Sequence, residues 1–175
     1  MNTQLNLKAL FHLSYGLYVV TSHLDGKPNG QIANTFFQVT AEPPRLAVCI
    51  NKENMTHECI QKSGVFAVSI LEQDTPFPFI GNFGFKSGKD ANKFENVSYI
   101  TGVTGVPIVT EHALSYMEVK VIGTMDAGTH TLFVGDLVDC RVLKEGTPLT
   151  YKYYHEVIKG KTPKKATTYQ AAPEK

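Results

Sequence analysis

Residues 30 to 51, GQIANTFFQVTAEPPRLAVCIN, place polar side chains inside two apolar runs. Because side chains alternate along a strand, Asn34, Phe36 and Gln38 share one face of the first run. Thr35 lies on the other face. Amides and a hydroxyl among aromatic rings suit a flat ligand that has apolar rings and a polar edge. The alternative is a half-buried strand whose two amides bond only to backbone groups.

A second candidate is the segment of residues 81 to 94, GNFGFKSGKDANKF. It interleaves three phenylalanines with three lysines and three glycines, a mixture that is unusual for a core element. We interpret it as a ligand-binding loop. The alternative is an ordinary surface loop that its aromatic side chains hold in place.

The three cysteines, Cys49, Cys59 and Cys140, are odd in number and widely spaced. This pattern predicts reduced thiols. It supports neither a disulfide framework nor a four-thiolate metal site. No cysteine or histidine shows a recognised metal-ligand spacing, so no metal is expected. The sequence also lacks GxGxxG after a strand, GxxxxGK[ST], HExxH and GxSxG. These residues alone therefore indicate no reaction.

Short apolar runs separated by turn signals must position the candidate residues. Asp25-Gly26 and Pro28-Asn29-Gly30 predict turns, Asn54 predicts a helix N-cap, and the Pro76 to Pro78 region predicts a turn or short helical piece. The expected strands and helices are strands at 17–22, 32–39, 46–50, 65–71, 114–122 and 132–143, and short helices at 5–13, 55–62 and 151–157. Strands dominate and a βαβ alternation is missing, so we predict a mainly β fold with a closed or partly closed antiparallel barrel.

Length and charge set further limits on the protein. A chain of 175 residues usually forms one domain. Seventeen Lys and Arg against sixteen Asp and Glu give a formal charge of +1, which predicts no nucleic-acid or membrane partner. No apolar run reaches the roughly 18 residues of a membrane helix, and the first ten residues do not resemble a signal peptide. We therefore expect a cytoplasmic protein.

Separated motifs, in order along nearly the whole chain, resemble the flavin reductase-like family of FMN-binding split barrels. The motifs are GLYVVT at 16–21, NTFxQxT from Asn34, AVCINKENxTH from Ala47, FGFKSGxDxxKF from Phe83, and YxYYHxxxKGKTPxxAxxY from Tyr151. Their wording most resembles the branch of ferric reductases and rubredoxin-linked flavin reductases. One departure is Gly128-Thr129-His130, where the wider family usually has Gly-Asp-His.

The resemblance implies a homodimer of antiparallel split barrels with FMN, and with FAD as an open alternative, at the subunit interface. Asn34 and Thr35 would then bind the polar edge of the flavin. Val48, Cys49 and Ile50 would lie near its ring system.

The resemblance also implies a phosphate site. Asn51 and Lys52 would reach the ribityl chain or the phosphate. The remaining phosphate contacts would come from the start of the 55–62 helix and from the glycine-rich loop, namely Asn54, Thr56, His57, Lys86, Ser87 and Lys89. A helix start attracts phosphate through its free N–H groups and its dipole.

The activity implied by the resemblance is electron transfer from NAD(P)H through the flavin to a ferric complex, free flavin or a redox protein. Cys49 and His130 would flank the reactive face and assist the acceptor step. The alternative is an electron-transfer module that holds FMN and does not use NAD(P)H. Residues 1–158 would form the split-barrel domain. Residues 159–175 would form a C-terminal extension that contacts the partner subunit, or a mobile basic tail.

Overall fold

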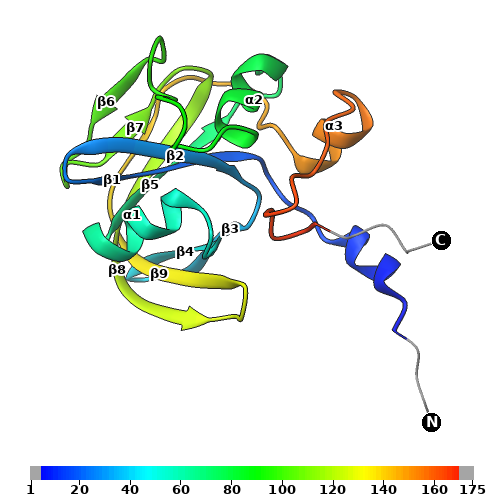
Figure 1. The fold of residues 1–175 in the computed structure, drawn as a ribbon, viewed down its shortest axis with the longest axis horizontal. Helices are drawn as coiled ribbons and strands as arrows, with labels where there is room; N and C mark the ends of the chain where they lie inside the picture. Colours follow the sequence, from blue (N-terminus) through cyan, green and yellow to red (C-terminus); the bar gives the residue numbers. More distant parts are fainter. Residues whose placement is uncertain (1–4, 170–175) are drawn as a thin grey trace.

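The computed structural model describes residues 5 to 169, and its main feature is an antiparallel sheet (Figure 1). The strand order is β2-β1-β5-β8-β9-β4-β3. The strands are β1 (Tyr18–Leu24), β2 (Lys27–Ala33), β3 (Phe36–Ala41), β4 (Pro44–Asn51), β5 (Val65–Leu71), β8 (Ala113–Asp126) and β9 (His130–Val142). The mainly β, antiparallel fold predicted from the sequence is confirmed.

The chain passes directly from one edge of this sheet to the other. β2 and β3 are the two edge strands, yet only Asn34 and Thr35 separate them in sequence. A connection of two residues can span only a short distance. The sheet must therefore curl until its two edges approach each other. The result is a barrel whose wall is split between β2 and β3. Asn34 lies at this split.

Short helices and a hairpin complete the fold (Figure 1). They are the 3₁₀ helix η1 (Leu7–His12), the helices α1 (Met55–Ser63), α2 (Phe77–Gly84) and α3 (Tyr151–Glu156), and the hairpin strands β6 (Tyr99–Thr101) and β7 (Pro107–Val109). α1 ends at Gly64, whose φ of 70° is left-handed and suits a glycine cap. α2 begins after Pro76, and its early proline fits a first turn that needs no intrahelical N–H donor.

Apolar side chains pack on both faces of the barrel wall. On β1, Val20 belongs to the inner cluster with Phe66 and Phe133, while its neighbour Val19 belongs to an outer cluster covered by α2. Alternation along a strand produces this division. A smaller outer cluster lies under the β6–β7 hairpin. The central strands are therefore buried on both faces and form a rigid support for the site.

Four local predictions need correction. Residues 28–30 do not form a turn but lie within β2, because the turn is completed at Asp25-Gly26, where both φ angles are positive. Residues 32–39 are not one strand, because the chain leaves β2 at Asn34 to cross the split. Residues 81–84 belong to the last turn of α2, so the predicted loop begins at residue 85. The first helix is 3₁₀ and covers only Leu7–His12.

Candidate functional site

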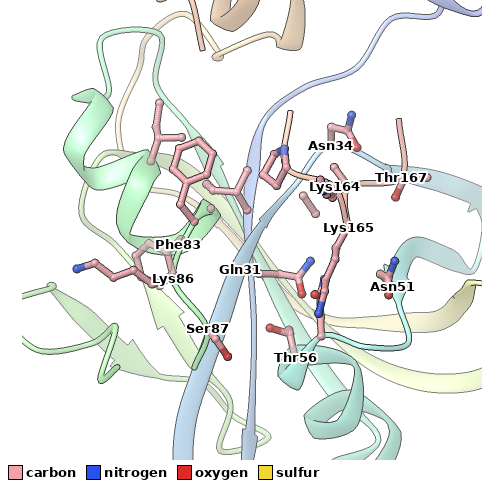
Figure 2. A pocket seen from close by; sticks show the side chains of 18 of the residues that line it. Gln31, Asn34, Asn51, Thr56, Phe83, Lys86, Ser87, Lys164, Lys165 and Thr167 are labelled. Atoms are coloured by element: carbon pink, nitrogen blue, oxygen red, sulfur yellow. The ribbon is translucent and has the colours of Figure 1, made fainter. Parts of the chain in front are cut away.

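A cavity of about 320 Å³ lies beside α1 (Figure 2). Its walls bring together residues that are far apart in sequence. They come from positions 29–34 on β2 and at the split, 49–56 at the end of β4 and the start of α1, 80–88 on α2 and the loop after it, and 161–167 after α3. A cavity where edge strands, helix ends and loops meet is a typical position for a ligand site.

The start of α1 forms one wall of the cavity. Thr56, in its first turn, is only 2% exposed and faces the cavity. Asn54 precedes the helix in extended conformation, and its side chain makes no cap hydrogen bond. The first N–H groups of a helix have no intrahelical acceptors, and the helix dipole makes this end positive. This wall can therefore bind an anionic group.

The loop after α2 forms a second wall. Lys86 and Ser87 line the cavity, and Figure 2 places them across the cavity from Asn51. The Lys86 ammonium donates to the side-chain oxygen of Asn82 at 3.1 Å. Gly88 lies so close to the amide of Asn29 on β2 that a Cβ atom would collide with it. A glycine at this position therefore lets the loop approach the barrel.

Two amide side chains lie near the split of the barrel. Asn34 is 5% exposed, donates through Nδ2 to Thr168 Oγ1 at 2.8 Å, and accepts from Thr35 Oγ1 at 3.0 Å. Gln31 on β2 also lines the cavity, and its Oε1 is buried. Within residues 5–169 this oxygen has no hydrogen-bond partner. A buried acceptor without a donor favours a ligand that carries an N–H or O–H group.

Residues 161–168 run along the cavity and will be called the C-terminal cover. The Lys165 ammonium pairs with the Glu53 carboxylate at 3.0 Å. Thr168 Oγ1 donates to the Tyr151 hydroxyl at 3.0 Å. Thr167 Oγ1 donates to the backbone oxygen of Cys49 at 3.4 Å. Side-chain contacts therefore hold this segment against the barrel of its own chain.

Comparison with known proteins decides the family. The flavin reductase like domain matches residues 10–158. The chain belongs to this family. It is 53% identical over 165 residues to a ferric-chelate reductase (NAD(P)H) of Archaeoglobus fulgidus, covering 94% of this chain and 98% of that protein.

Two further relatives extend the comparison. A high molecular weight rubredoxin of Moorella thermoacetica is 46% identical over 98% of this chain, which spans 75% of that protein. The solved structure of flavin reductase HpaC complexed with NADP+ superposes with a TM-score of 0.71 at 25% identity, covering 83% of this chain and 90% of that one. The flavin reductase family resemblance read from the sequence motifs is confirmed.

Many residues that the sequence assigned to the flavin line this cavity. They are Asn34, Cys49, Asn51, Asn54, Thr56, Lys86 and Ser87. They come from the barrel split, the end of β4, the start of α1 and the loop after α2. The fold thus brings these residues together around one cavity. Their individual contacts with a flavin stay predictions.

Other assigned residues lie outside the cavity lining. Val48 and Ile50 are buried in the inner cluster of the barrel. Thr35 adjoins the site through its bond to Asn34. The Lys52 ammonium pairs with the Asp126 carboxylate at 2.6 Å.

His57 and Lys89 also lie outside the lining. His57 Nε2 shares a 2.8 Å hydrogen bond with Thr131 Oγ1, and the His57 ring packs on Phe133. Burial, and then the charge of Lys52, lower the pKa of His57. Lys89 is an exposed residue of the loop after α2. Direct contacts of these residues with a flavin also stay predictions.

Cys49 and His130 occupy neighbouring positions on paired strands. Asn51 pairs with His130, and Cys49 pairs two residues further along with Leu132. Cys49 lines the cavity, and burial raises the pKa of its thiol. Burial lowers the pKa of His130, an effect that a contact with the Lys165 backbone partly offsets. The strand register thus places the thiol and the imidazole at the same end of the barrel.

Sequence analysis did not identify several residues that line the cavity. They include Gln31, Lys93, Tyr151, Tyr154 and most of the C-terminal cover. Lys93 is the third lysine of the predicted loop, so its motif was recognised but its burial was not. The cover forms cavity wall only because the chain after α3 folds back.

Residues 5–169 contain neither a membrane-spanning helix nor a cluster of metal-binding side chains. No helix among them is long and apolar enough to cross a membrane. No cluster of three or more His, Cys, Asp or Glu side chains in residues 5–169 is arranged to hold a metal ion.

Proposed function

We propose that this protein uses a bound FMN to transfer electrons from NADH or NADPH to an acceptor. One observation carries the proposal: a cavity at the barrel split combines an anion-binding helix start with amide and aromatic side chains. The Archaeoglobus fulgidus relative, a ferric-chelate reductase (NAD(P)H), supports the choice of donor, and NADP+ bound to HpaC supports it further.

The cavity walls are suited to a flavin. Phe83 and Tyr151 supply aromatic surface for a ring system. Gln31 and Asn34 supply hydrogen-bonding groups for its polar edge. The start of α1, beside Thr56, is a wall that can take a phosphate. A single phosphate wall favours FMN, whereas FAD would have to extend its adenylate beyond that wall.

The side chains of this protein would mainly position the reactants and exclude water. When bound, the flavin supplies the hydride-accepting and electron-donating chemistry. The first N–H groups of α1 and the Lys86 ammonium would hold the phosphate. The unpaired Gln31 oxygen would accept a hydrogen bond from the flavin, and the C-terminal cover would keep water from that edge. Positioning of this kind can account for a large share of rate acceleration.

The acceptor is proposed by class only. The Archaeoglobus fulgidus relative is named a ferric-chelate reductase, which favours a ferric complex as acceptor. The Moorella thermoacetica relative is named a high molecular weight rubredoxin, which favours a redox protein. Free flavin is the third acceptor. The competing function is an electron-transfer module that holds FMN and receives electrons from a protein instead of NAD(P)H.

Anaerobic reduction separates these two functions. Flavin-loaded protein is mixed with NADH or NADPH, and the visible absorption band is followed. We expect one or both donors to bleach the band. Dithionite serves as the control that the bound flavin can be reduced. A band that dithionite bleaches and neither nicotinamide changes would overturn the reductase and favour the electron-transfer module.

We also propose a homodimer in a reducing compartment such as the cytoplasm. Several large apolar side chains are exposed on η1, on the edge strand β3 and on the last part of β8, namely Leu7, Phe11, Val39, Ile122 and Met125. Monomers rarely expose large apolar patches, and Figure 1 shows η1 projecting away from the barrel. Sedimentation at micromolar concentration should give a flavin-bound dimer, and a flavin-bound monomer would contradict the proposed dimer.

The proposed compartment rests on the cysteines. The three thiols form no disulfide, which supports a reducing compartment.

A further inference from the structure

A chain of hydrogen bonds runs from the barrel split to α3. Asn34 Nδ2 donates to Thr168 Oγ1 at 2.8 Å, and Thr168 Oγ1 donates to the Tyr151 hydroxyl at 3.0 Å. The Tyr151 hydroxyl lies 2.5 Å from Thr162 Oγ1, which lies 3.3 Å from His155 Nε2. These consecutive contacts connect the buried Asn34 with His155, a residue outside the cavity lining.

The backbone determines which nitrogen of His155 carries the hydrogen. Nδ1 lies 3.0 Å from the backbone oxygen of Gly160, and a carbonyl oxygen can only accept. Nδ1 therefore carries the hydrogen, which leaves Nε2 of the neutral ring as an acceptor. Gly160 packs so closely on the Tyr154 ring that a Cβ atom would collide with it, and its N–H donates to the Tyr154 backbone oxygen at 3.0 Å. The Gly160 carbonyl is thus held in place.

The hydrogens of this chain point in one direction. The Asn34 amide nitrogen can only donate, and each hydroxyl has a single hydrogen. When His155 Nε2 accepts at the far end, every hydroxyl accepts from the Asn34 side and donates toward His155, and every contact is satisfied. A proton on Nε2 would give the chain a donor at both ends. One hydroxyl hydrogen would then lose its acceptor.

The same chain holds the C-terminal cover. Thr162 lies near the start of the cover and Thr168 ends it, and both contact the hydroxyl of Tyr151, the first residue of α3. The cover has no strand or helix of its own. Its closed position therefore depends on side-chain contacts such as these.

We propose that His155 is a positioning residue that keeps the C-terminal cover closed over the cavity, and that a proton on its ring releases the cover. The inference rests on the proposed function, because the ligand that the cover retains is the flavin. Neutral His155 accepts the last hydrogen of the chain and stabilises the closed cover. Protonated His155 has N–H donors on both nitrogens and cannot accept. Flavin release should therefore become faster as the pH falls.

Other titratable groups lie around His155. The Tyr151 ring packs edge-on against it, with ring centroids 4.3 Å apart, and the Tyr154 ring does so at 5.2 Å. Burial raises the pKa of Tyr154, which keeps its hydroxyl neutral. All of these groups are retained when His155 alone is replaced. The charged groups of α3, of the turn after it and of the cover are Lys152, Glu156, Lys159, Lys161, Lys164 and Lys165.

The test compares wild-type protein with His155→Gln at pH 8 and pH 5, the limits of the range in which histidine side chains ordinarily change charge. Glutamine offers a donor and an acceptor but takes up no proton. Stopped-flow fluorescence measures the rate of FMN release. We expect the ratio of the wild-type rate to the His155→Gln rate to be about 1 at pH 8 and about 3 to 5 at pH 5, because the protonated ring loses one hydrogen bond.

The ratio removes other effects of acid. The phosphate of FMN gains a proton near pH 6. His57 and His130 also lie near the cavity. Wild type and His155→Gln share the ligand and both histidines, so these contributions cancel.

Further variants separate the hydrogen-bond chain from ring packing. His155→Phe keeps a ring against Tyr151 but offers no acceptor, so it should release FMN about 3- to 5-fold faster than wild type at pH 8. Tyr151→Phe removes only the hydroxyl in the middle of the chain and should have at least this effect. In that background His155→Phe should add less than about 1.5-fold, because both changes break one chain. His23→Gln replaces a half-buried histidine of β1 outside the cavity lining and is the matched control.

Hydrogen exchange of the flavin-free protein tests the cover without any ligand. Residues 161–168 are identical in wild type and His155→Gln, so their intrinsic exchange rates are equal at equal pH. We expect the amides of the cover to exchange about 3- to 5-fold faster in wild type than in His155→Gln at pH 5, and at equal rates at pH 8.

The outcomes separate the inference from the proposed function. Equal exchange of the cover in the two proteins at pH 5 would overturn the inference and leave the flavin function standing. Additive effects of Tyr151→Phe and His155→Phe would also overturn it. Faster exchange in wild type at pH 5 without FMN binding at any pH would support the role of His155 and overturn the proposed function. If His155→Phe does not fold, the comparison with His155→Gln still decides the question.

Discussion

The wall of the cavity at α1 and the C-terminal cover are held by different kinds of contact. The wall is continuous with the barrel, because only three residues separate β4 from α1 and β4 pairs with β9 from Arg45 to Asn51. The cover has no strand or helix of its own. Side-chain bonds hold it, such as those of Thr168 to Asn34 and of Lys165 to Glu53.

This difference indicates separate roles for the two regions. A wall built into a cooperative sheet keeps its shape with or without ligand, whereas a segment held by few side-chain bonds can open at low cost. The cover also occupies one N–H group of Asn34, a residue that was predicted to bind the flavin edge. We therefore expect the wall to determine flavin affinity and the cover to determine how fast the flavin leaves.

The largest expected effect comes from a charge placed in the wall. Thr56→Glu puts a carboxylate beside the phosphate position at the start of α1. We expect FMN affinity to fall by about 100-fold, or about 2.7 kcal/mol, because two anions would share a poorly solvated site. Thr56→Val, which removes only the hydroxyl, is the matched control. A folded Thr56→Glu protein with wild-type affinity would remove the phosphate from this wall.

The second effect comes from removal of most of the cover. Deletion of residues 163–175 retains Thr162, whose hydroxyl bonds to Tyr151 at 2.5 Å. We expect the FMN dissociation rate to rise by about 10-fold, while the melting temperature changes by less than about 2 °C, because the barrel core is untouched. Stopped-flow release and thermal unfolding measure the two quantities. A large loss of thermal stability would instead make the cover part of the folded core.

A smaller effect separates two neighbouring threonines of the cover. Thr168 bonds to the buried Asn34 and to Tyr151, whereas Thr167 makes one long bond to the Cys49 backbone. Thr168→Val should raise the flavin dissociation rate by about 5-fold, because it leaves a buried amide donor unpaired. Thr167→Val should change it by less than about 2-fold. Equal effects of the two substitutions would contradict a specific role for the Asn34 bond.

Sequence patterns predicted the wall better than the cover, for a physical reason. The wall depends on local signals: Asn54 before a helix, Gly64 after it, and apolar alternation in the flanking strands. The split at Asn34 was missed because alternation continues across it while the backbone changes edge. The cover has little to bury, so no apolar pattern marks it. Its contact between Thr168 and Asn34 joins residues 134 positions apart.

The same limit applies to Lys93. It ends a largely polar segment that contains Ser87, Asp90 and Asn92, and lysines in such a segment are usually exposed. Only the packing of the loop against Gly30 and Phe83 removes its ammonium from solvent. Motif reading therefore found the loop, and the tertiary structure was needed to distinguish its buried lysine from the exposed Lys89.

The smallest expected effect concerns the rate of electron transfer to the acceptor. It compares two residues at the same end of the barrel. Cys49 lines the cavity, while His130 lies two strand positions away and outside the lining. Both side chains are competent ligands for transition metals, so a ferric complex that approaches this end of the barrel could contact them transiently. We expect Cys49→Ala and His130→Ala to slow reoxidation by ferric chelates by about 2- to 5-fold, a loss typical of one weak contact. Flavin affinity and reduction by nicotinamide should stay within about 2-fold, since neither side chain holds the phosphate or the polar edge. Anaerobic stopped-flow experiments measure the reductive and oxidative half-reactions separately. Of the two, Cys49→Ala should have the larger effect, because Cys49 lines the cavity and His130 does not. Unchanged reoxidation in both variants would show that the thiol and the imidazole only pack at the strand ends, and the acceptor would then meet the flavin through the cover side of the cavity.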